Sequence, residues 1–325
     1  MTTLSQQHAD TDDGIAELEQ YRTELRGYCY RMLGSLFEAE DAVQETILKA
    51  WQRRDSFEGR SSLRSWLYRI ATNVCIDSLR SRQRRAMPMD LSSPVPATTE
   101  PTEMLPDKAW LEPAPDAAVV PSDADPAQRA VLTESVRLAF VAALQTLPPR
   151  QRAVLLLREV LCWQASEVAT LLDTTVASVN SALQRARATI GALDLENRSP
   201  EPLATEERDL LVRYVSAFES YDIDALVELL REDASISMPP IVMWLRGRAD
   251  LRDWYLGTRI GCCGSRLVPT RANGLPAFGQ YRRDPRGGHA PWSLQVLEIK
   301  DGRLAHVHHF LDTSLFQRFG LPTHL

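Results

Sequence analysis

Two consecutive amphipathic segments in the first quarter of the chain constrain its fold most strongly. In the first, Glu40–Trp51 (EDAVQETILKAW), apolar residues recur at the spacing of a helix and predict a stripe that faces a core. These residues are Val43, Ile47, Ala50 and Trp51. A second stripe beside it is acidic and polar with one leucine, and consists of Asp41, Gln44, Glu45 and Leu48. Such a stripe suits contact with a partner helix.

The second segment, Arg60–Arg85, predicts a helix with the same division into two faces. Its apolar face consists of Leu63, Trp66, Leu67, Ile70 and Val74, and its other face of Arg69, Asn73, Ile76 and Arg80. Cations and an amide together can hold phosphates and read a base. Seven arginines and one aspartate give the segment a net charge of +6, whereas the whole chain has −6. Phosphate neutralisation explains this segregation better than an ordinary solvated helix face does.

With both motifs in this order and spacing, residues 18–87 resemble region 2 of the extracytoplasmic-function (ECF) sigma factors, the promoter-recognition subunits of bacterial RNA polymerase. The resemblance implies that Asp41, Gln44, Glu45 and Leu48 contact the largest catalytic subunits of core polymerase. It also implies that Phe57, the loop after it and Asn73 hold an extruded base of the −10 promoter element. Arg69 and Arg80 would then bind phosphates.

The character of the chain changes between Ala86 and Pro126. Nine prolines interrupt any periodicity, and eight acidic residues against one lysine make the stretch strongly negative. We expect an acidic, proline-rich linker at residues 88–126. Three interpretations stay open for it: a disordered tether, a segment anchored through Trp110 and Leu111, and an acidic strand that imitates nucleic acid near the polymerase active-site channel.

Helical periodicity returns in residues 127–193. The segment Leu147–Glu159 (LPPRQRAVLLLRE) places proline at a predicted helix start, where its missing N–H costs nothing. Two short helices then follow, joined by a tight turn at Asp173 and Thr174, with Thr175 as the candidate N-cap of the second. The pattern predicts a helix-turn-helix whose second helix ends in a basic cluster.

This segment resembles region 4 of the same sigma family, whose second helix enters the major groove of the −35 element. The resemblance assigns −35 contacts to Ser178, Asn180, Ser181, Gln184, Arg185 and Arg187. Many relatives carry a cation where Asn180 and Ala182 stand here. Because an asparagine can bond adenine and an alanine can pack on a thymine methyl, we expect an altered base preference.

After a short linker at 194–204, residues 205–325 form a further predicted domain. Two helices precede alternating strands at 266–272, 277–282, 292–300 and 303–311, the last two joined by the hairpin signal Asp301-Gly302. Helices followed by a curved antiparallel sheet predict an α+β cone. The order, with the phrases SYDIDALVELLREDA and IKDGRLAHVHHFLD, resembles the SnoaL-like branch of the NTF2-like superfamily.

Some proteins of that fold are enzymes, so the cone could hold a small-molecule pocket. Its candidate lining residues are Trp244, Tyr255, His306 and His308. No nucleophile with a paired base and no acid pair is recognisable from the spacing, and we expect no catalytic residues. The five cysteines show no metal-ligand spacing with the six histidines, so no metal and no cofactor are expected.

The length of 325 residues and the 44% of apolar residues are those of a globular chain of two or three domains. No apolar run approaches the length of a membrane span, and the polar, acidic N-terminus is unlike a signal peptide. We therefore expect a cytoplasmic protein that does not insert into membranes.

The expected architecture is multidomain: an all-α region 2 bundle (1–87), the linker, an all-α region 4 helix-turn-helix (127–193) and an α+β SnoaL-like (NTF2-like) cone (205–325). The expected function is that of an ECF-type sigma factor, not an enzyme, which binds core RNA polymerase and promoter DNA and is modulated in cis by contacts of the cone with the sigma regions. Two alternatives differ in class: a sensor enzyme that is tethered to nucleic acid, and a helix-turn-helix regulator that does not join polymerase. An anti-sigma factor or a small ligand stays open as a further partner.

Overall fold

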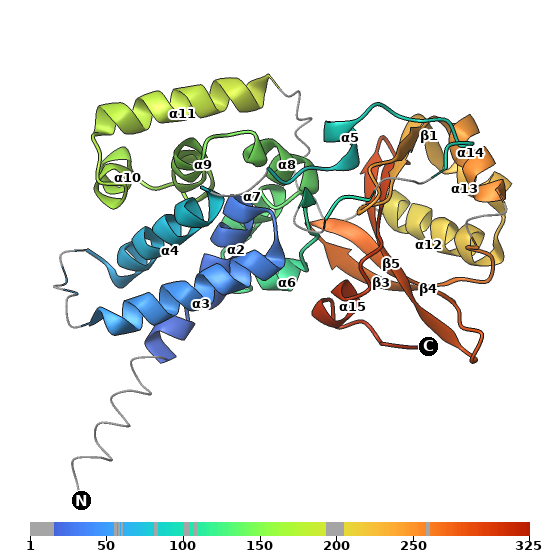
Figure 1. The fold of residues 1–325 in the computed structure, drawn as a ribbon, viewed down its shortest axis with the longest axis horizontal. Coiled ribbons are helices and arrows are strands. Elements are labelled where there is room, and N and C mark those ends of the chain that lie inside the picture. Colours follow the sequence, from blue (N-terminus) through green and yellow to red (C-terminus); the bar gives the residue numbers. More distant parts are fainter. Residues whose placement is uncertain are drawn as a thin grey trace, which may run out of the picture. The chain divides into compact units, whose positions relative to one another are not determined.

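The computed structural model describes residues 16–54, 57, 59, 61–80, 84–100, 104–106, 109–192, 205–257 and 261–325. They belong to two compact units (Figure 1). The first unit lies within residues 1–85 and 116–199, and the second within 86–115 and 200–325. The expected linker at 88–126 is thus divided between the two units. The expected short linker at 194–204 lies outside the described residues.

The first unit begins with three helices that pack together, α2 (Arg22–Leu33), α3 (Leu36–Gln52) and α4 (Leu63–Leu79). Gly34, with φ 71°, ends α2, and the hydroxyl of Ser35 then caps α3 by accepting the N–H of Glu38. Ser62 caps α4 in the same way. The predicted core stripe of α3 is buried at Val43, Ile47 and Ala50.

The later part of this unit is also helical: α6 (Asp116–Val119), α7 (Pro126–Glu134), α8 (Leu138–Gln145), α9 (Pro149–Leu155), the π-helix η3 (Leu156–Val160), α10 (Ala165–Leu171) and α11 (Val176–Gly191). Helices α10 and α11 form the predicted helix-turn-helix. Asp173 makes the turn with φ 49°, and the Thr175 hydroxyl accepts the N–H of Ser178 at 3.1 Å.

Buried hydrogen bonds join α2 to these later helices. Arg31 donates from Nε to the Ser135 hydroxyl at 2.8 Å and from Nη2 to the Leu132 carbonyl at 2.9 Å. In the opposite direction, Arg152 donates to the Met32 carbonyl at the end of α2. The last carbonyls of a helix have no partner within it, so this guanidinium satisfies a group that α2 cannot satisfy itself. Both arginines are buried.

The second unit is an α+β domain. Its elements are α5 (Pro88–Leu91), α12 (Thr205–Ser220), α13 (Ile223–Glu228), β1 (Leu230–Ser237), β2 (Trp244–Arg246), α14 (Arg248–Leu256), β3 (Arg266–Ala272), β4 (Leu275–Arg283), β5 (His289–Lys300), β6 (Arg303–Phe310) and α15 (Leu315–Arg318). Asp301 and Gly302 have φ 52° and 69° and make the predicted tight turn between β5 and β6.

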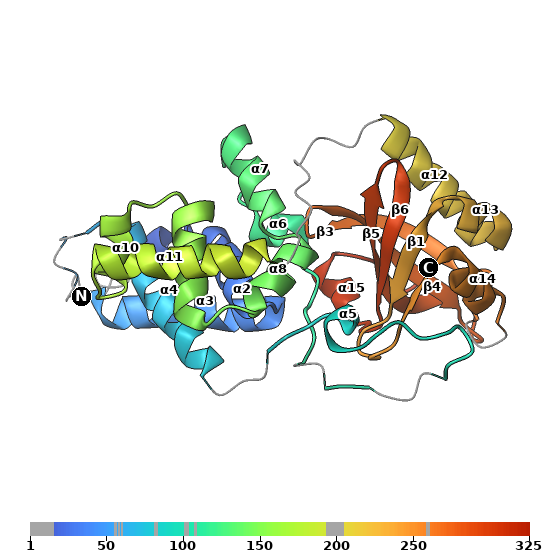
Figure 2. The same ribbon diagram turned by 90° about the horizontal axis from the view of Figure 1, so that it is seen from above.

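The six strands form one sheet in the order β2-β1-β6-β5-β4-β3. We expected a curved antiparallel sheet, and the pairings of β3 to β6 in sequence and of β1 with β2 are antiparallel, but β1 pairs with β6 in parallel. The cause is topological, because β1 enters the sheet beside the last strand and not beside β3, its next long strand in sequence. Helices α12, α13 and α14 pack on one face of the curved sheet (Figure 2), around a core that includes Tyr214, Phe278 and Leu297.

The stretch from Ala86 to Pro115, which we name the strap, is built into this second unit. Its backbone donates from Val95 to the Trp244 carbonyl at 3.0 Å, and Trp244 Nε1 donates back to Ser92 at 2.9 Å. At its far end, Ala114 N donates to the Asn273 side chain at 2.9 Å. Trp110 and Leu111, the expected anchor, are both buried.

The two ends of the strap meet. Ala86 N donates to the Ala109 carbonyl at 3.0 Å, Leu111 N donates to the Ala86 carbonyl at 3.2 Å, and Ala86 and Trp110 form a parallel bridge. Much of the strap is therefore a loop that closes on itself at its base.

Candidate polymerase and promoter interfaces

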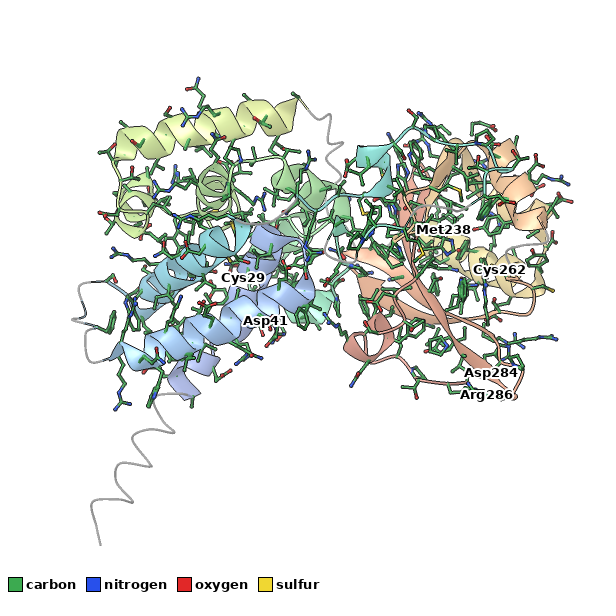
Figure 3. The ribbon with its side chains drawn as sticks, in the orientation of Figure 1. Cys29, Asp41, Met238, Cys262, Asp284 and Arg286 are labelled. Carbon is green, nitrogen blue, oxygen red and sulfur yellow. The ribbon has the colours of Figure 1, made fainter. Side chains whose placement is uncertain are left out.

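The acidic stripe of α3 is exposed over its whole length. Asp41, Gln44 and Glu45 are exposed, and Leu48 keeps 55% of its surface accessible although it is apolar (Figure 3 labels Asp41). Glu45 pairs with Lys49 one turn later, with 2.6 Å between Oε1 and Nζ. The structure therefore places the four predicted polymerase-contact residues on one surface of one helix.

Phe37 was missed from this stripe. It is 54% exposed and precedes Asp41 by four residues, so it lies one turn earlier on the same face of α3. The i, i+4 spacing was readable in the sequence, but it lies outside the segment Glu40–Trp51 on which the stripe was defined. An exposed phenylalanine at one end and an exposed leucine at the other frame the acidic residues.

The predicted base-reading face of α4 is also open. Arg69, Asn73 and Arg80 are exposed, whereas the opposite face of α4 is buried at Leu67, Ile70 and Val74. Arg80 pairs with Asp77 at 2.9 Å, a surface ion pair that DNA phosphates could replace at small cost. Phe57 is half-buried and lies with its ring 5.0 Å from that of Trp66, so it is fixed near the start of α4.

The six residues assigned to the −35 element are all exposed on α11: Ser178, Asn180, Ser181, Gln184, Arg185 and Arg187. Val179, Leu183 and Ala186 point inward and hold the helix. Arg185 donates to the Ser181 hydroxyl at 2.6 Å, and Arg187 pairs with Glu159 at 2.5 Å. Both arginines are thus held in this structure by contacts that binding to DNA would replace.

The four candidate pocket residues of the cone are not brought together. Trp244 and His308 are both register partners of Ser237, and His306 is the partner of Ser235, so these three lie on one face of the sheet. Tyr255 belongs to the core on the opposite, helix-covered face. Strand alternation placed the histidines correctly relative to one another, but it could not tell which face the helices cover.

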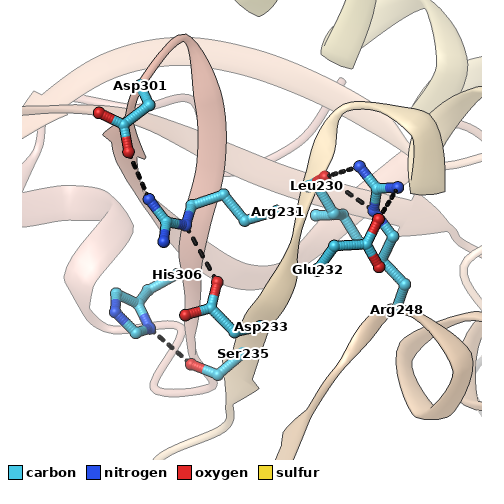
Figure 4. A network of polar contacts seen from close by, with 8 residues as sticks. All are labelled: Leu230, Arg231, Glu232, Asp233, Ser235, Arg248, Asp301 and His306. Atoms are coloured by element: carbon cyan, nitrogen blue, oxygen red, sulfur yellow. Dashed lines mark hydrogen bonds and ion pairs between the residues drawn. The ribbon is translucent and has the colours of Figure 1, made fainter.

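On the face opposite the helices, hydroxyls and imidazoles form a ladder. Ser235 Oγ lies 2.6 Å from His306 Nδ1, and Ser237 Oγ lies 2.9 Å from His308 Nδ1, whose Nε2 is 3.2 Å from Glu298. Burial lowers the pKa of His306 below its ordinary value. Figure 4 shows Ser235 and His306 beside the Arg231 ion pairs with Asp233 and Asp301. Ser237 is fully buried.

A second polar network fills the helix-covered side of the sheet. Tyr214 donates to Gln295 at 2.7 Å, and Gln295 and Ser293 both donate to Gln280 at 3.0 and 2.9 Å. His309 lies 3.4 Å from the Ser293 hydroxyl and is buried, which lowers its pKa to about 3. Mutually satisfied groups of this kind specify a core.

Within the described part of the chain, no group of three or more His, Cys, Asp or Glu side chains could hold a metal ion. None of the helices that the structure describes is long and apolar enough to cross a bilayer.

An exposed acidic helix, a helix with exposed arginines and an exposed asparagine, a helix-turn-helix and an α+β cone in one chain are typical of a promoter-recognition subunit with a fused domain. Comparison with known proteins agrees. The family model described as "Sigma-70 region 2" matches residues 18–85, that described as "Sigma-70, region 4" matches residues 137–190, and that described as "SnoaL-like domain" matches residues 211–307. The chain belongs to the ECF RNA polymerase sigma factor family, and sigma factors are not enzymes.

The relatives are similar along most of their length. The ECF RNA polymerase sigma factor SigG of Mycobacterium tuberculosis is 47% identical over 320 residues, which cover 96% of this chain and 85% of SigG. SigJ of the same organism is 29% identical, covering 95% of this chain and 97% of SigJ. The crystal structure of Mycobacterium tuberculosis SigJ aligns with a TM-score of 0.60 at 22% identity, over 95% of this chain and all of that one, and shows the same fold.

Proposed function

We propose that this sigma factor docks core RNA polymerase through the α3 stripe and reads promoters through α4 and α11. The observation that carries the proposal is the exposure of all four stripe residues, Leu48 included, on a helix whose other face is packed. An apolar side chain flanked by carboxylates is costly to leave in water and suits a partner surface with apolar and basic groups. The helix-turn-helix regulator that works without polymerase gives no reason for this stripe.

Promoter reading would divide between two elements. Asn73 with Phe57 would hold an extruded base of the −10 element, with Arg69 and Arg80 on phosphates. Residues of α11 would enter the major groove at the −35 element, where Asn180 can bond adenine and Arg185 and Arg187 supply cations. Apart from the half-buried Phe57, all of these side chains are exposed, which supports the assignment.

Regulation in cis would act through the strap. The roughly 24 residues between Ala86 and Trp110 could span about 80 Å when extended, but their ends are hydrogen-bonded to each other while the strap lies on the SnoaL-like domain. This closure shortens the usable connection between region 2 and region 4. Sigma factors need that connection to pass through polymerase, so the domain would restrain activity until the strap is released.

Reconstituted transcription tests the proposal. Purified protein is added to core polymerase, and run-off transcripts are measured from a library of promoter fragments. We expect promoter-specific transcripts that depend on the protein, and we expect Leu48→Asp to abolish both transcription and core binding. The matched control is Val212→Asp, which also replaces an exposed apolar side chain by aspartate but lies on α12 of the second unit. Phe218→Asp would not serve as a control, because Phe218 is buried. Promoter-specific transcripts from Leu48→Asp at the wild-type level would reject the docking assignment.

A further inference from the structure

A cavity of about 330 Å³ lies within the first unit, where α2 and α4 meet the segment that runs from α6 to α7. Arg31 and Arg64 line it from the region 2 helices, and Val119 and Leu132 line it from the later segment. None of the polymerase or promoter residues assigned above takes part in it, so the proposed function leaves this cavity unexplained.

Arg31 is the unbalanced charge of the cavity. Its side chain is only 2% exposed, and its two hydrogen bonds go to neutral acceptors, the Ser135 hydroxyl and the Leu132 carbonyl. Among the residues that the structure describes, no carboxylate lies within ion-pair distance of it. Burial lowers the pKa of Arg31 to about 10, which still leaves the guanidinium charged at neutral pH. A buried cation without a counter-ion is unfavourable.

The other charged groups in the lining do not compensate it. Glu24 already accepts from Arg64 Nε at 2.7 Å and from the Tyr68 hydroxyl at 2.9 Å, so its charge is committed to that cluster. Asp123 is exposed and therefore solvated. The cavity thus offers one desolvated guanidinium, Arg31, and a guanidinium is the donor that carboxylates and phosphates prefer.

We infer that this cavity binds a small oxyanion, the carboxylate or phosphate group of a metabolite, on Arg31. The occupant would touch α2, α4 and α7 at once. Since Arg31 also bonds Leu132 and Ser135, a bound oxyanion stabilises the packing of region 2 against the later helices. By linkage, any state in which these helices separate binds the oxyanion less tightly.

The test uses the full chain and two probes, inorganic phosphate and succinate, each compared with sodium chloride at equal ionic strength. For the wild type we expect at least one probe to raise Tm by about 2 °C or more at millimolar concentration. A response to phosphate alone identifies a phosphoryl ligand, and a response to succinate alone identifies a carboxylate. Arg31→Met should abolish the shift, whereas Arg150→Met, which removes an exposed arginine of the same unit, should keep it.

Phosphate also stabilises proteins without binding to a site, and the variants separate the two effects because both experience the general one. If Arg31→Met does not fold, Ala124→Trp provides the second test, because it fills the cavity from its lining and leaves Arg31 in place. Loss of the shift in Ala124→Trp supports the site. Absence of any probe-specific shift in the wild type, or an undiminished shift in whichever of the two variants folds, overturns it.

Discussion

Asn73 carries the most specific residue-scale prediction, because it is an exposed amide between two arginines on α4. We expect Asn73→Ala to reduce open-complex formation at a cognate promoter by roughly tenfold to a hundredfold, the equivalent of about 1–3 kcal/mol for one lost base contact. Closed-complex binding should survive, since Arg69 and Arg80 remain. Permanganate footprinting and filter binding measure the two steps separately. An equal loss on unrelated DNA would mean that Asn73 meets only the backbone.

Gly27 lies where the backbone at Val119, in the chain that follows the strap, approaches α2 closely. A Cβ at this position would lie 2.3 Å from the Val119 carbonyl oxygen and 2.9 Å from an Arg31 nitrogen. Gly27→Ala should therefore destabilise the first unit by about 1–3 kcal/mol, because backbone has to move.

Gly191 is the matched control for Gly27. It also lies in a helix, α11, but nothing is within 4 Å of a Cβ there. Gly191→Ala should be neutral or stabilise the protein by up to about 1 kcal/mol. Urea denaturation followed by circular dichroism compares the two, and equal midpoints would contradict the close approach.

His309 predicts a pH dependence of the second unit. Burial holds its pKa at about 3 in the folded domain, below the ordinary value of 6.5. Between these values the unfolded chain binds a proton that the folded one does not, so stability is complete above about pH 6.5 and falls as the pH drops. The loss should approach about 1.4 kcal/mol per pH unit. In His309→Gln, the free energy of unfolding, measured by denaturation between pH 6.5 and pH 4, should depend less steeply on pH, because the contribution of this one proton to the slope is removed. An unchanged slope would show that His309 is protonated in the fold.

At the scale of the element, the exposed charges of α3 should allow the binding of core polymerase to be weakened without loss of folding stability. Reversing the charge of Asp41 and Glu45 to lysine should weaken core polymerase binding at least tenfold, because like charges then face a basic partner surface. Folding should be nearly unaffected, since the Glu45–Lys49 pair is exposed and such pairs contribute about 0–1 kcal/mol.

The matched control for this pair is Glu206→Lys with Asp209→Lys, which makes the same change of net charge on the exposed side of α12. A competition assay against a labelled sigma factor measures affinity. If both double variants bind core polymerase as the wild type does, the α3 stripe is not the docking surface.

Local sequence patterns predicted most helices and strands, whereas contacts between segments distant in the sequence were harder to predict. The period of 3.6 located α3 and α4, and the Asp301-Gly302 turn located β5 and β6, because these signals reside in adjacent residues. The parallel pairing of β1 with β6 joins residues about 70 positions apart and leaves no local signal. For the same reason, sequence grouped Tyr255 with His306 although the sheet separates them.

The strap shows why composition misleads about a linker. Prolines and acids predicted a segment unable to bury itself, yet the strap is held largely by backbone groups, such as Val95 N on Trp244 and Leu105 N on Pro240. Backbone hydrogen bonds do not require a particular side chain. The sequence signal for attachment of the strap to the second unit was the pair Trp110 and Leu111, two apolar residues in a polar stretch, and both are buried.

At the scale of the whole molecule, the proposed restraint by the closed strap predicts a direction of regulation. While Ala86 is paired with Trp110, region 2 and region 4 are joined through residues 111–126, and opening the strap returns about 24 residues to the connection. Loss of buried Trp110 packing in Trp110→Ala should therefore raise transcription from a cognate promoter with core polymerase in limiting amount.

Asn273→Gly should act in the same direction by a different route. Asn273 has φ 55°, which glycine adopts readily, so this substitution removes the side-chain acceptor of Ala114 N and leaves the turn between β3 and β4 intact. Asn273→Gly combined with Trp110→Ala should give at least the activity of either alone, and truncation before residue 205 should approach the same level. Asp301→Gly, at the turn between β5 and β6, is the control, because the Asp301 side chain pairs with Arg231 of β1 and not with the strap. If run-off transcription is unchanged in both strap variants while Asp301→Gly matches wild type, the closed strap does not restrain initiation. If transcription falls in both, the SnoaL-like domain supports initiation.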